Sequence, residues 1–196
     1  MSVASILIFV FEILYLLIPA AVANTMPVFV KKYFKRLDYP IDFYKKISGE
    51  RVLGDNKTFR GFIFGILGSI IIVLIQSKLY NLSFFFYKHS LIDYSNINVI
   101  FFGLLSGFSV LLFDSIASFI KRRLKVKPGK SLLILDQVNG GLGFGLFLLL
   151  FFIIVDKISP DLYVYIFIFS IILTWTIGHF IIKYLGYLLK LEKAKI

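Results

Sequence analysis

Cysteine is absent from the 196-residue chain, and histidine occurs only twice, as His89 and His179. Disulfides and thiolate metal centres are therefore excluded, and the two histidines have no metal-ligand spacing. Long polar stretches are missing too, so we predict no separate water-soluble domain. Acidic residues are also scarce: 11 Asp and Glu stand against 22 Lys and Arg, which gives a net charge of +11.

Apolar residues dominate what is present, at 59% of the chain, with a mean hydropathy of +0.88. A bilayer-spanning helix needs roughly 20 apolar residues. We place such runs at residues 3–23, 59–79, 97–120, 131–155 and 160–185. The first run carries Glu12 and lacks a basic region before it, which favours a retained span over a cleaved signal. The sequence therefore predicts an all-α, polytopic membrane protein with five transmembrane helices, folded as a single domain over residues 1–196.

The distribution of basic residues predicts the orientation in the membrane. Nineteen of the 22 Lys and Arg fall in residues 24–60, residues 121–130 and the C-terminal segment from Lys183. Basic residues accumulate on the cytoplasmic side. We therefore expect residues 24–60 and 121–130 to be cytoplasmic loops of a multi-pass protein of the cell membrane, with the N-terminus outside and the C-terminus in the cytoplasm. We assign the positive charge to contacts with membrane lipids and phosphates, with no nucleic-acid partner.

Two carboxylates lie in or beside apolar runs, near the predicted cytoplasmic face. Asp114 lies within the third run, and Asp136 lies near the start of the fourth. Ionisable residues in membrane segments are candidates for functional sites. Carboxylates near phosphate-binding cations suit Mg²⁺, which takes substrate phosphates as further ligands. The alternative is that each acid forms a helix-end salt bridge with a nearby cation.

Helical spacing places further polar side chains beside these acids. Ser118, Lys121 and Arg122 share a helical face with Asp114, so that one stripe carries a carboxylate, a hydroxyl and two cations. Arginine binds phosphate oxygens bidentately, and lysine binds them as a point charge. Asn139 lies one turn after Asp136 and offers an oxygen to a metal or an amide to a phosphate.

Five other residues are weaker candidates. Lys57, Thr58 and Arg60 begin the second span, where a helix N-terminus favours anions; the alternative is a capped helix with a basic flank. Asn24 ends the first predicted span, where it either caps the helix or contacts a ligand. A single histidine such as His179 is more often a packed, hydrogen-bonding residue than a catalyst.

A series of motifs carries a family resemblance over nearly the whole chain. In chain order they are P-A-A-V-A-N (19–24), I-D-F (41–43), G-E-R-V-L-G-D-N-K-T-F-R-G (49–61), D-S-I-A-S-F-I-K-R-R (114–123), K-P-G (127–129), L-D-Q-V (135–138) and His179. Together they resemble the membrane cytidylyltransferases, and the archaeal CDP-archaeol synthases fit best. Two positions depart from the family pattern: Asn139 replaces the last Asp of D-Q-x-D, and Phe113 replaces a Gly.

The resemblance implies a reaction and roles for the candidate residues. CTP and a lipid phosphate, 2,3-bis-O-geranylgeranylglycerol 1-phosphate (unsaturated archaetidic acid), would give CDP-archaeol and pyrophosphate, with Mg²⁺ required. By resemblance, the metal set is Asp114, Asp136 and Asn139; the S-x-x-K-R signature is Ser118, Lys121 and Arg122; and the nucleotide or phosphate contacts are Lys57, Thr58 and Arg60. The catalytic set is Asp114, Lys121, Arg122 and Asp136, and Asn24 and His179 join the substrate-binding set.

Three alternatives remain open at this point: a CTP-dependent lipid kinase, a CDP-diacylglycerol synthase, and a non-catalytic membrane binding or transport protein. A transporter would be expected to show inverted repeats or broken mid-membrane helices, and the sequence displays neither. A homodimer is a further hypothesis.

Overall fold

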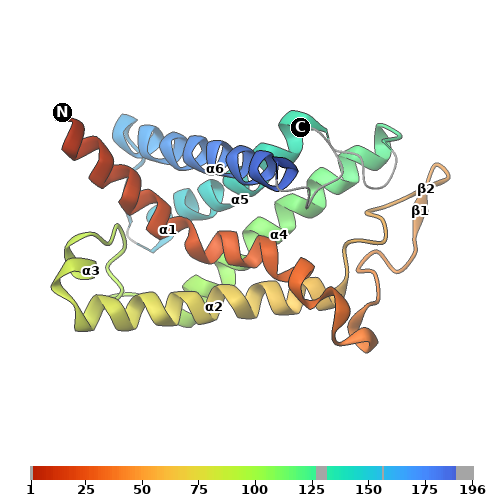
Figure 1. The fold of residues 1–196 in the computed structure, drawn as a ribbon, viewed down its shortest axis with the longest axis horizontal. Helices are drawn as coiled ribbons and strands as arrows, with labels where there is room; N and C mark the ends of the chain where they lie inside the picture. Colours follow the sequence, from red (N-terminus) through yellow and green to blue (C-terminus); the bar gives the residue numbers. More distant parts are fainter. Residues whose placement is uncertain (1, 127–131, 156, 189–196) are drawn as a thin grey trace.

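The protein folds as a helical bundle whose helices run between two structured ends (Figure 1). The structure is a computed structural model that describes residues 2–126, 132–155 and 157–188. Its elements are α1 (Val3–Phe29), 3₁₀ turns η1 (Val30–Lys32) and η2 (Lys35–Leu37), strands β1 (Lys46–Ile47) and β2 (Glu50–Arg51), α2 (Phe59–Leu82), α3 (Phe84–Lys88), α4 (Val99–Arg123), α5 (Leu133–Ile154) and α6 (Leu162–Leu188). The K-P-G motif at 127–129 lies outside the described residues.

Five of the described helices, α1, α2, α4, α5 and α6, are long and apolar enough to cross a membrane. The prediction of five apolar helices and a multi-pass protein is confirmed. The aromatic residues that follow α2 form the five-residue helix α3, which is too short to span a membrane. Large apolar side chains cover the outer faces of the long helices, as expected where lipid replaces water as the solvent.

The predicted end of the first span at Ala23 is wrong, because α1 continues to Phe29 and encloses both Asn24 and Pro27. Pro27 cannot donate to the carbonyl of Ala23, which normally ends a helix in water. Packing against α2 compensates for the loss. A Cβ placed on Gly65 would lie 2.8 Å from the Ala23 oxygen, and one on Gly61 would lie 3.2 Å from the Pro27 Cβ. Asn24 is therefore a residue within the helix and not its cap.

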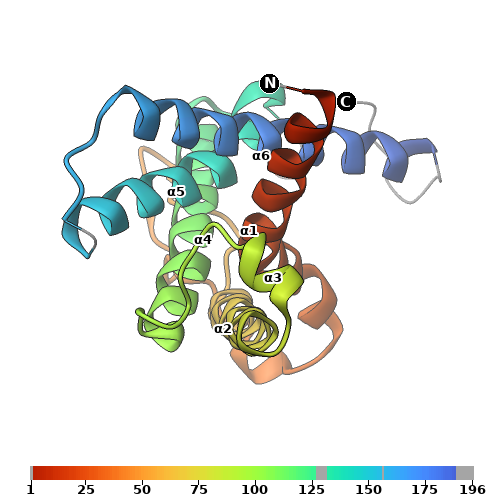
Figure 2. The same ribbon diagram turned by 90° about the vertical axis from the view of Figure 1, so that its left-hand side faces the viewer.

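The helices pack in an order that brings the ends of α2, α4 and α5 together. Helix α2 packs between α1 and α4, α4 packs on α5, and α5 packs on α6. Gly103 and Gly107 permit the close α2–α4 contact, since a Cβ at either position would lie 2.8 Å from an α2 atom. In Figure 2, which views α2 end on, α6 is seen from the side, so these two helices are strongly inclined to each other.

The two ends of the bundle differ. Helix α3 lies at one end and the β1–β2 hairpin at the other (Figure 1). The hairpin end also holds the start of α2 and the end of α4, and the candidate residues gather there.

Candidate active site

Asp114 lies at the centre of a cluster formed by three separate parts of the chain. Lys57, in the turn before α2, forms an ion pair with the Oδ2 atom of Asp114 on α4. The side-chain amide of Asn139 on α5 donates to Oδ1 of the same carboxylate over 3.4 Å. The Oδ1 atom of Asn139 accepts from the Gly140 N–H at 2.6 Å, which fixes the orientation of the amide. The structure therefore brings together three predicted residues that are far apart in sequence.

A second ion pair joins the end of α4 to the start of α5. The Nζ atom of Lys121 lies 2.6 Å from Oδ1 of Asp136, and both side chains are 16% exposed. The other carboxylate oxygen of Asp136 accepts from the Leu132 N–H at 3.0 Å, at the N-terminus of α5. A negative charge there is favoured by the unpaired N–H groups of the first turn. Asp136 therefore stabilises the helix start as well as the α4–α5 junction.

Each predicted metal-binding carboxylate thus pairs with a lysine, as in the salt-bridge alternative that the sequence left open. The donor chemistry also fits Mg²⁺, because Asp114 and Asn139 meet at one point and Asp136 lies one turn from Asn139 on α5. A cluster of three His, Cys, Asp or Glu side chains is absent from the described residues, since the third member of this set is an amide. The carboxylates of Asp114 and Asp136 are thus the candidate oxygen ligands, and the Asn139 oxygen, which accepts from the Gly140 N–H in this structure, would join them only if the amide turned.

Arg122 adds a buried cation next to Lys121 in the chain. The residue as a whole is 7% exposed, and its Nε atom has no hydrogen-bond partner among the described residues. A Cβ added to Gly54 would lie 3.9 Å from that Nε atom, so the Gly54 turn packs against the guanidinium group. Ser118, one turn earlier on α4, is also buried. A buried arginine edge without a partner is suited to an anionic ligand.

Thr58 and Arg60 make structural contacts in this arrangement. The Thr58 hydroxyl accepts from the Gly61 N–H at 3.2 Å and caps α2, as in the capped-helix alternative. Arg60 is 3% exposed and donates to the Tyr33 carbonyl at 3.0 Å and to Asp38 at 2.8 Å. Their contact with a nucleotide stays a prediction. Of the three candidates at the start of α2, Lys57 is the one that reaches the Asp114 cluster.

His179 lies in the α5–α6 interface, where it contacts the residue next to Asp136. Its Nδ1 atom lies 2.6 Å from the Gln137 side-chain oxygen, and its ring stacks on Trp175 with an interplanar angle of 9°. Gln137 is the neighbour of Asp136. The packed, hydrogen-bonding interpretation of His179 agrees with these contacts, and its role in substrate binding stays a prediction, as does that of Asn24, which is partly buried in α1.

Glycines of α5 explain how these helices come so close. A Cβ on Gly143 would lie 2.6 Å from the Ser109 carbonyl of α4, and one on Gly145 would lie 3.1 Å from Ile172 of α6. Both glycines therefore serve the close packing of neighbouring helices. Gly143 also lines an apolar groove of about 380 Å³ between α4 and α5. Phe113 lines the same groove, which therefore extends to the residue before Asp114.

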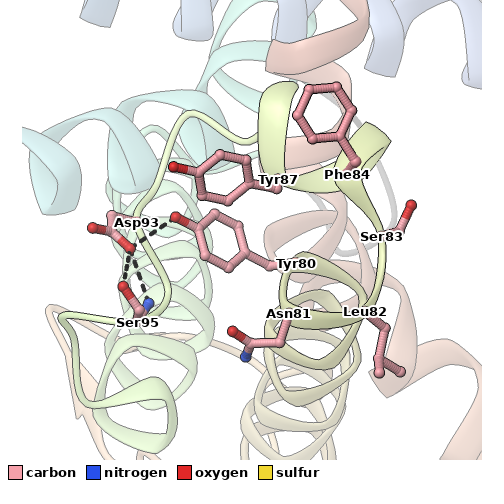
Figure 3. Close-up of a pocket in the computed structure, with 8 residues that line it drawn as sticks. All are labelled: Tyr80, Asn81, Leu82, Ser83, Phe84, Tyr87, Asp93 and Ser95. Carbon is pink, nitrogen blue, oxygen red and sulfur yellow. Dashed lines mark hydrogen bonds between the residues drawn. The ribbon is translucent and has the colours of Figure 1, made fainter.

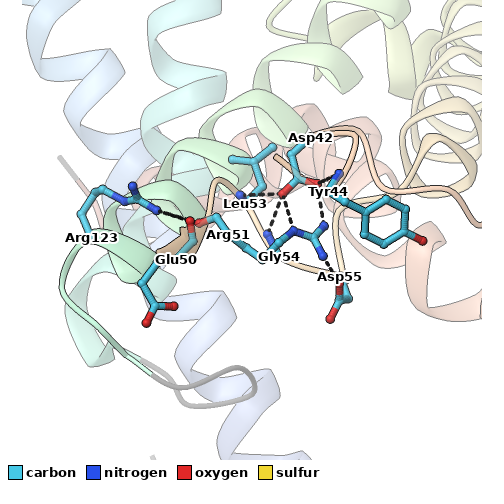
Figure 4. A network of polar contacts seen from close by, with 8 residues as sticks. All are labelled: Asp42, Tyr44, Glu50, Arg51, Leu53, Gly54, Asp55 and Arg123. Atoms are coloured by element: carbon cyan, nitrogen blue, oxygen red, sulfur yellow. Dashed lines mark hydrogen bonds and ion pairs between the residues drawn. The ribbon is translucent and has the colours of Figure 1, made fainter. Parts of the chain in front are cut away.

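Sequence reasoning missed the role of Asp42, at the centre of the I-D-F motif. Its carboxylate accepts from Arg51 at 2.6 Å and from the N–H groups of Leu53 and Gly54 at 3.0 and 3.2 Å (Figure 4). Burial opposes ionisation, but these hydrogen bonds outweigh it and hold the pKa of Asp42 below its usual value. The same pairing raises the pKa of Arg51. The I-D-F motif was the only local signal.

A different polar pocket lies at the α3 end of the bundle. It has a volume of about 440 Å³ and is lined in part by Tyr80, Tyr87, Asp93 and Ser95 (Figure 3). Hydrogen bonds from Ser95 first, and then from Tyr80, lower the pKa of Asp93 to about 2. Asp93 is the only carboxylate among the residues that line this pocket. It therefore lacks the paired oxygen ligands and buried cations of the hairpin end.

Comparison with known proteins adds sequence and fold evidence. A sequence model of the CarS-like CDP-archaeol synthase family matches residues 6–195. The CDP-archaeol synthase of Sulfurisphaera tokodaii is 31% identical over 94% of this chain and 95% of its own length. That of Thermococcus gammatolerans is 33% identical over 88% and 91%. The fold is shared, at 19% identity and a TM-score of 0.62, with a solved intramembrane enzyme for archaeal membrane lipid biosynthesis, over 91% of this chain and 94% of the other.

Proposed function

Since this chain belongs to the CDP-archaeol synthase family, we propose that it transfers CMP from CTP to unsaturated archaetidic acid, producing CDP-archaeol and pyrophosphate. The observation that carries the proposal is the Asp114 cluster, where Lys57 and Asn139 converge on one carboxylate from two other parts of the chain. The family match covers nearly the whole chain, so the cluster lies within the matched region.

The proposed reaction is an in-line displacement at phosphorus. An oxygen of the lipid phosphate bonds to the α-phosphorus of CTP, and the bond from that phosphorus to the oxygen bridging to the β-phosphate breaks. Pyrophosphate leaves with the electron pair. The lipid phosphate is already ionised at neutral pH, so no side chain has to remove a proton. The protein's work is then positioning and neutralisation of charge.

Six side chains would divide this work. Lys57 and Lys121 neutralise carboxylates in this structure, and we propose that their ammonium groups turn to phosphate oxygens when substrates bind. Arg122 would bind phosphate through its buried guanidinium group. Asp114, with Asn139 and Asp136, would hold Mg²⁺, which when bound neutralises phosphate charge.

The apolar groove between α4 and α5 would hold one isoprenoid chain of the lipid. Its lining includes Phe113, Gly143 and Phe147, and it exposes almost no polar atoms. Because Phe113 precedes Asp114, a chain in the groove leaves the attached phosphate close to the Asp114 cluster. The positive-inside bias supports a cytoplasmic hairpin end, which is the side from which CTP is available. The homodimer stays a prediction.

Pyrophosphate release by purified protein in detergent tests the proposal. The assay contains CTP, Mg²⁺ and 2,3-bis-O-geranylgeranylglycerol 1-phosphate. We expect Asp114→Asn and Asp136→Ala to lose activity by about 100-fold or more, because each removes a charge that positions phosphates. Asp161→Asn is the matched control: Asp161 caps α6 at an exposed site, and asparagine caps a helix equally well.

The products separate the alternatives. A lipid kinase would release CDP instead of pyrophosphate. A CDP-diacylglycerol synthase would prefer a diacyl ester phosphate to the geranylgeranyl ether. A non-catalytic protein would release neither product with any lipid phosphate, which would contradict the proposed function.

A further inference from the structure

Asp42 anchors a loop that ends at the candidate active site. Its side chain is 1% exposed, although it lies outside the long helices. It accepts hydrogen bonds from the N–H groups of Tyr44, Leu53 and Gly54, and two more from the guanidinium group of Arg51. A buried carboxylate is costly unless it is paired and hydrogen-bonded, and here each oxygen has at least two donors.

The backbone around Asp42 adopts costly conformations. Phe43 and Tyr44 have φ values of 52° and 60°, in the left-handed region that non-glycine residues seldom occupy. Such strain persists only where the surrounding contacts impose it, and it clusters at functional sites. The Asp42 carboxylate supplies such a contact through the Tyr44 N–H, and the Arg51 guanidinium lies 4.7 Å from the centre of the Tyr44 ring.

This anchored segment is joined directly to Lys57. The Ile41 N–H donates to the Lys57 carbonyl at 2.9 Å, and Pro40 and Thr58 form a β-bridge. Gly54, held by the Asp42 carboxylate, has a φ of 96° and begins the turn that leads to Lys57. Asp42 therefore holds both the segment at residues 40–41, which pairs with Lys57 and Thr58, and the turn that leads to Lys57.

Arg123 secures the far side of the same loop. It donates to the carbonyl of Arg51 at 2.7 Å (Figure 4) and to that of Ile47 at 2.8 Å, so the β1–β2 hairpin is attached to the end of α4. The β1–β2 hairpin lies beyond the long helices (Figure 1). By the positive-inside bias, this is the side from which a water-soluble nucleotide would arrive. The lipid would instead arrive from between the helices.

We propose that Asp42 is a positioning residue for the nucleotide: by fixing the Gly54–Lys57 turn, it sets Lys57 and the Gly54 backbone beside Arg122, where the triphosphate of CTP binds. The inference rests on the proposed function for the identity of the nucleotide. It assigns Asp42 an effect on the CTP side of the reaction and none on the lipid side.

Steady-state kinetics of Asp42→Asn test the assignment. Asparagine keeps the size of the side chain but loses the charge and one acceptor, so the Gly54–Lys57 turn loosens. We expect the KM for CTP to rise about 10- to 100-fold, the range seen when supporting hydrogen bonds of a site are removed. The KM for the lipid phosphate should stay within about 2-fold, since no contact of Asp42 reaches the α4–α5 groove.

Asp55→Asn is the matched control. Asp55 binds the same guanidinium group at 2.5 Å, but its side chain is 78% exposed. Exposed ion pairs contribute little, so both KM values should stay within about 2-fold of the parent. A role of Asp42 in folding alone would lower the amount of active protein and leave the KM for CTP unchanged.

A second measurement does not depend on catalysis. The chain has no cysteine, so spin labels can be placed at Asn56→Cys and Ile116→Cys, both exposed positions. The distance distribution between the labels should be narrow in the parent, broad in Asp42→Asn and narrow in Asp55→Asn. An equally narrow distribution in Asp42→Asn, or a KM for CTP that does not change, would overturn the positioning role. Absence of cytidylyl transfer by the parent, with the expected broadening, would instead contradict the proposed function alone.

Discussion

Replacing Asn139 by aspartate tests whether Asn139 and Asp114 face the same cation. The amide of Asn139 lies 3.4 Å from a carboxylate oxygen of Asp114, and the residue is 8% exposed. Asn139→Asp therefore places two carboxylates in contact, in a site where water screens them poorly. We expect the variant to be less stable than the parent when divalent cations are removed, and to recover when Mg²⁺ is added.

The magnitude follows from the distance. Two unit charges about 4 Å apart repel by about 4 kcal/mol at the effective dielectric constant of a partly buried protein site. Lys57 offsets part of the repulsion, which leaves about 2–4 kcal/mol. For a chain of this size, the midpoint of thermal unfolding should fall by roughly 5–10 °C.

The assay is thermal unfolding in detergent, with EDTA and then with excess Mg²⁺. Asn98→Asp is the matched control, because Asn98 caps α4 by accepting from the Phe101 N–H at 3.0 Å. The same chemical change there should be neutral or slightly stabilising at a helix N-terminus. If Asn139→Asp unfolds at the parent temperature in EDTA and does not respond to Mg²⁺, the two side chains do not share a cation site.

Two further predictions concern packing and pH. Gly140→Ala should lower the free energy of unfolding by about 1–3 kcal/mol, because its Cβ would lie 2.3 Å from Trp175. Thermal unfolding checks this, and Gly178→Ala is the control. A Cβ at Gly178 would meet no packed neighbour within 4 Å, so that variant should lose no stability. The pKa of Asp42 is lower in the folded protein than its ordinary value of 3.8, so its stabilising contribution is complete above about pH 4 and is lost as the pH falls through the folded pKa. The protection of the backbone amides that Asp42 binds, measured as the exchange rate relative to the intrinsic rate at each pH, should therefore stay high at pH 5 and fall below pH 4, and equal protection at both would contradict this pairing.

Composition and run length were sufficient to predict the five long helices, since a bilayer span is defined by both. The end of α1 was not predictable in the same way. Pro27 and Asn24 are local signals for a helix end, but Gly61 and Gly65 of α2 pack against this turn and keep it helical. Tertiary packing overrode the local preference for a helix end, and this packing is visible only in the folded structure.

The candidate site was predicted as a set of residues and not as an arrangement. Helical spacing related Asp114 to Lys121 and Arg122, which share α4. It gave no relation between Asp114 and Lys57, which lie on different elements and meet only when α2 packs on α4. The same reason hid Asp42, whose partners Arg51, Leu53 and Gly54 follow it by 9 to 12 positions in a loop without periodicity.

The fate of labelled phosphorus tests the central claim most directly. Purified protein would be given CTP labelled at either the α- or the γ-phosphorus, with Mg²⁺ and 2,3-bis-O-geranylgeranylglycerol 1-phosphate. The account predicts that the α-label enters the lipid, that the γ-label appears in pyrophosphate, and that Asp114→Asn abolishes both. Transfer of the γ-label to the lipid would show a kinase, and retention of both labels in CTP with intact, folded protein would contradict the account.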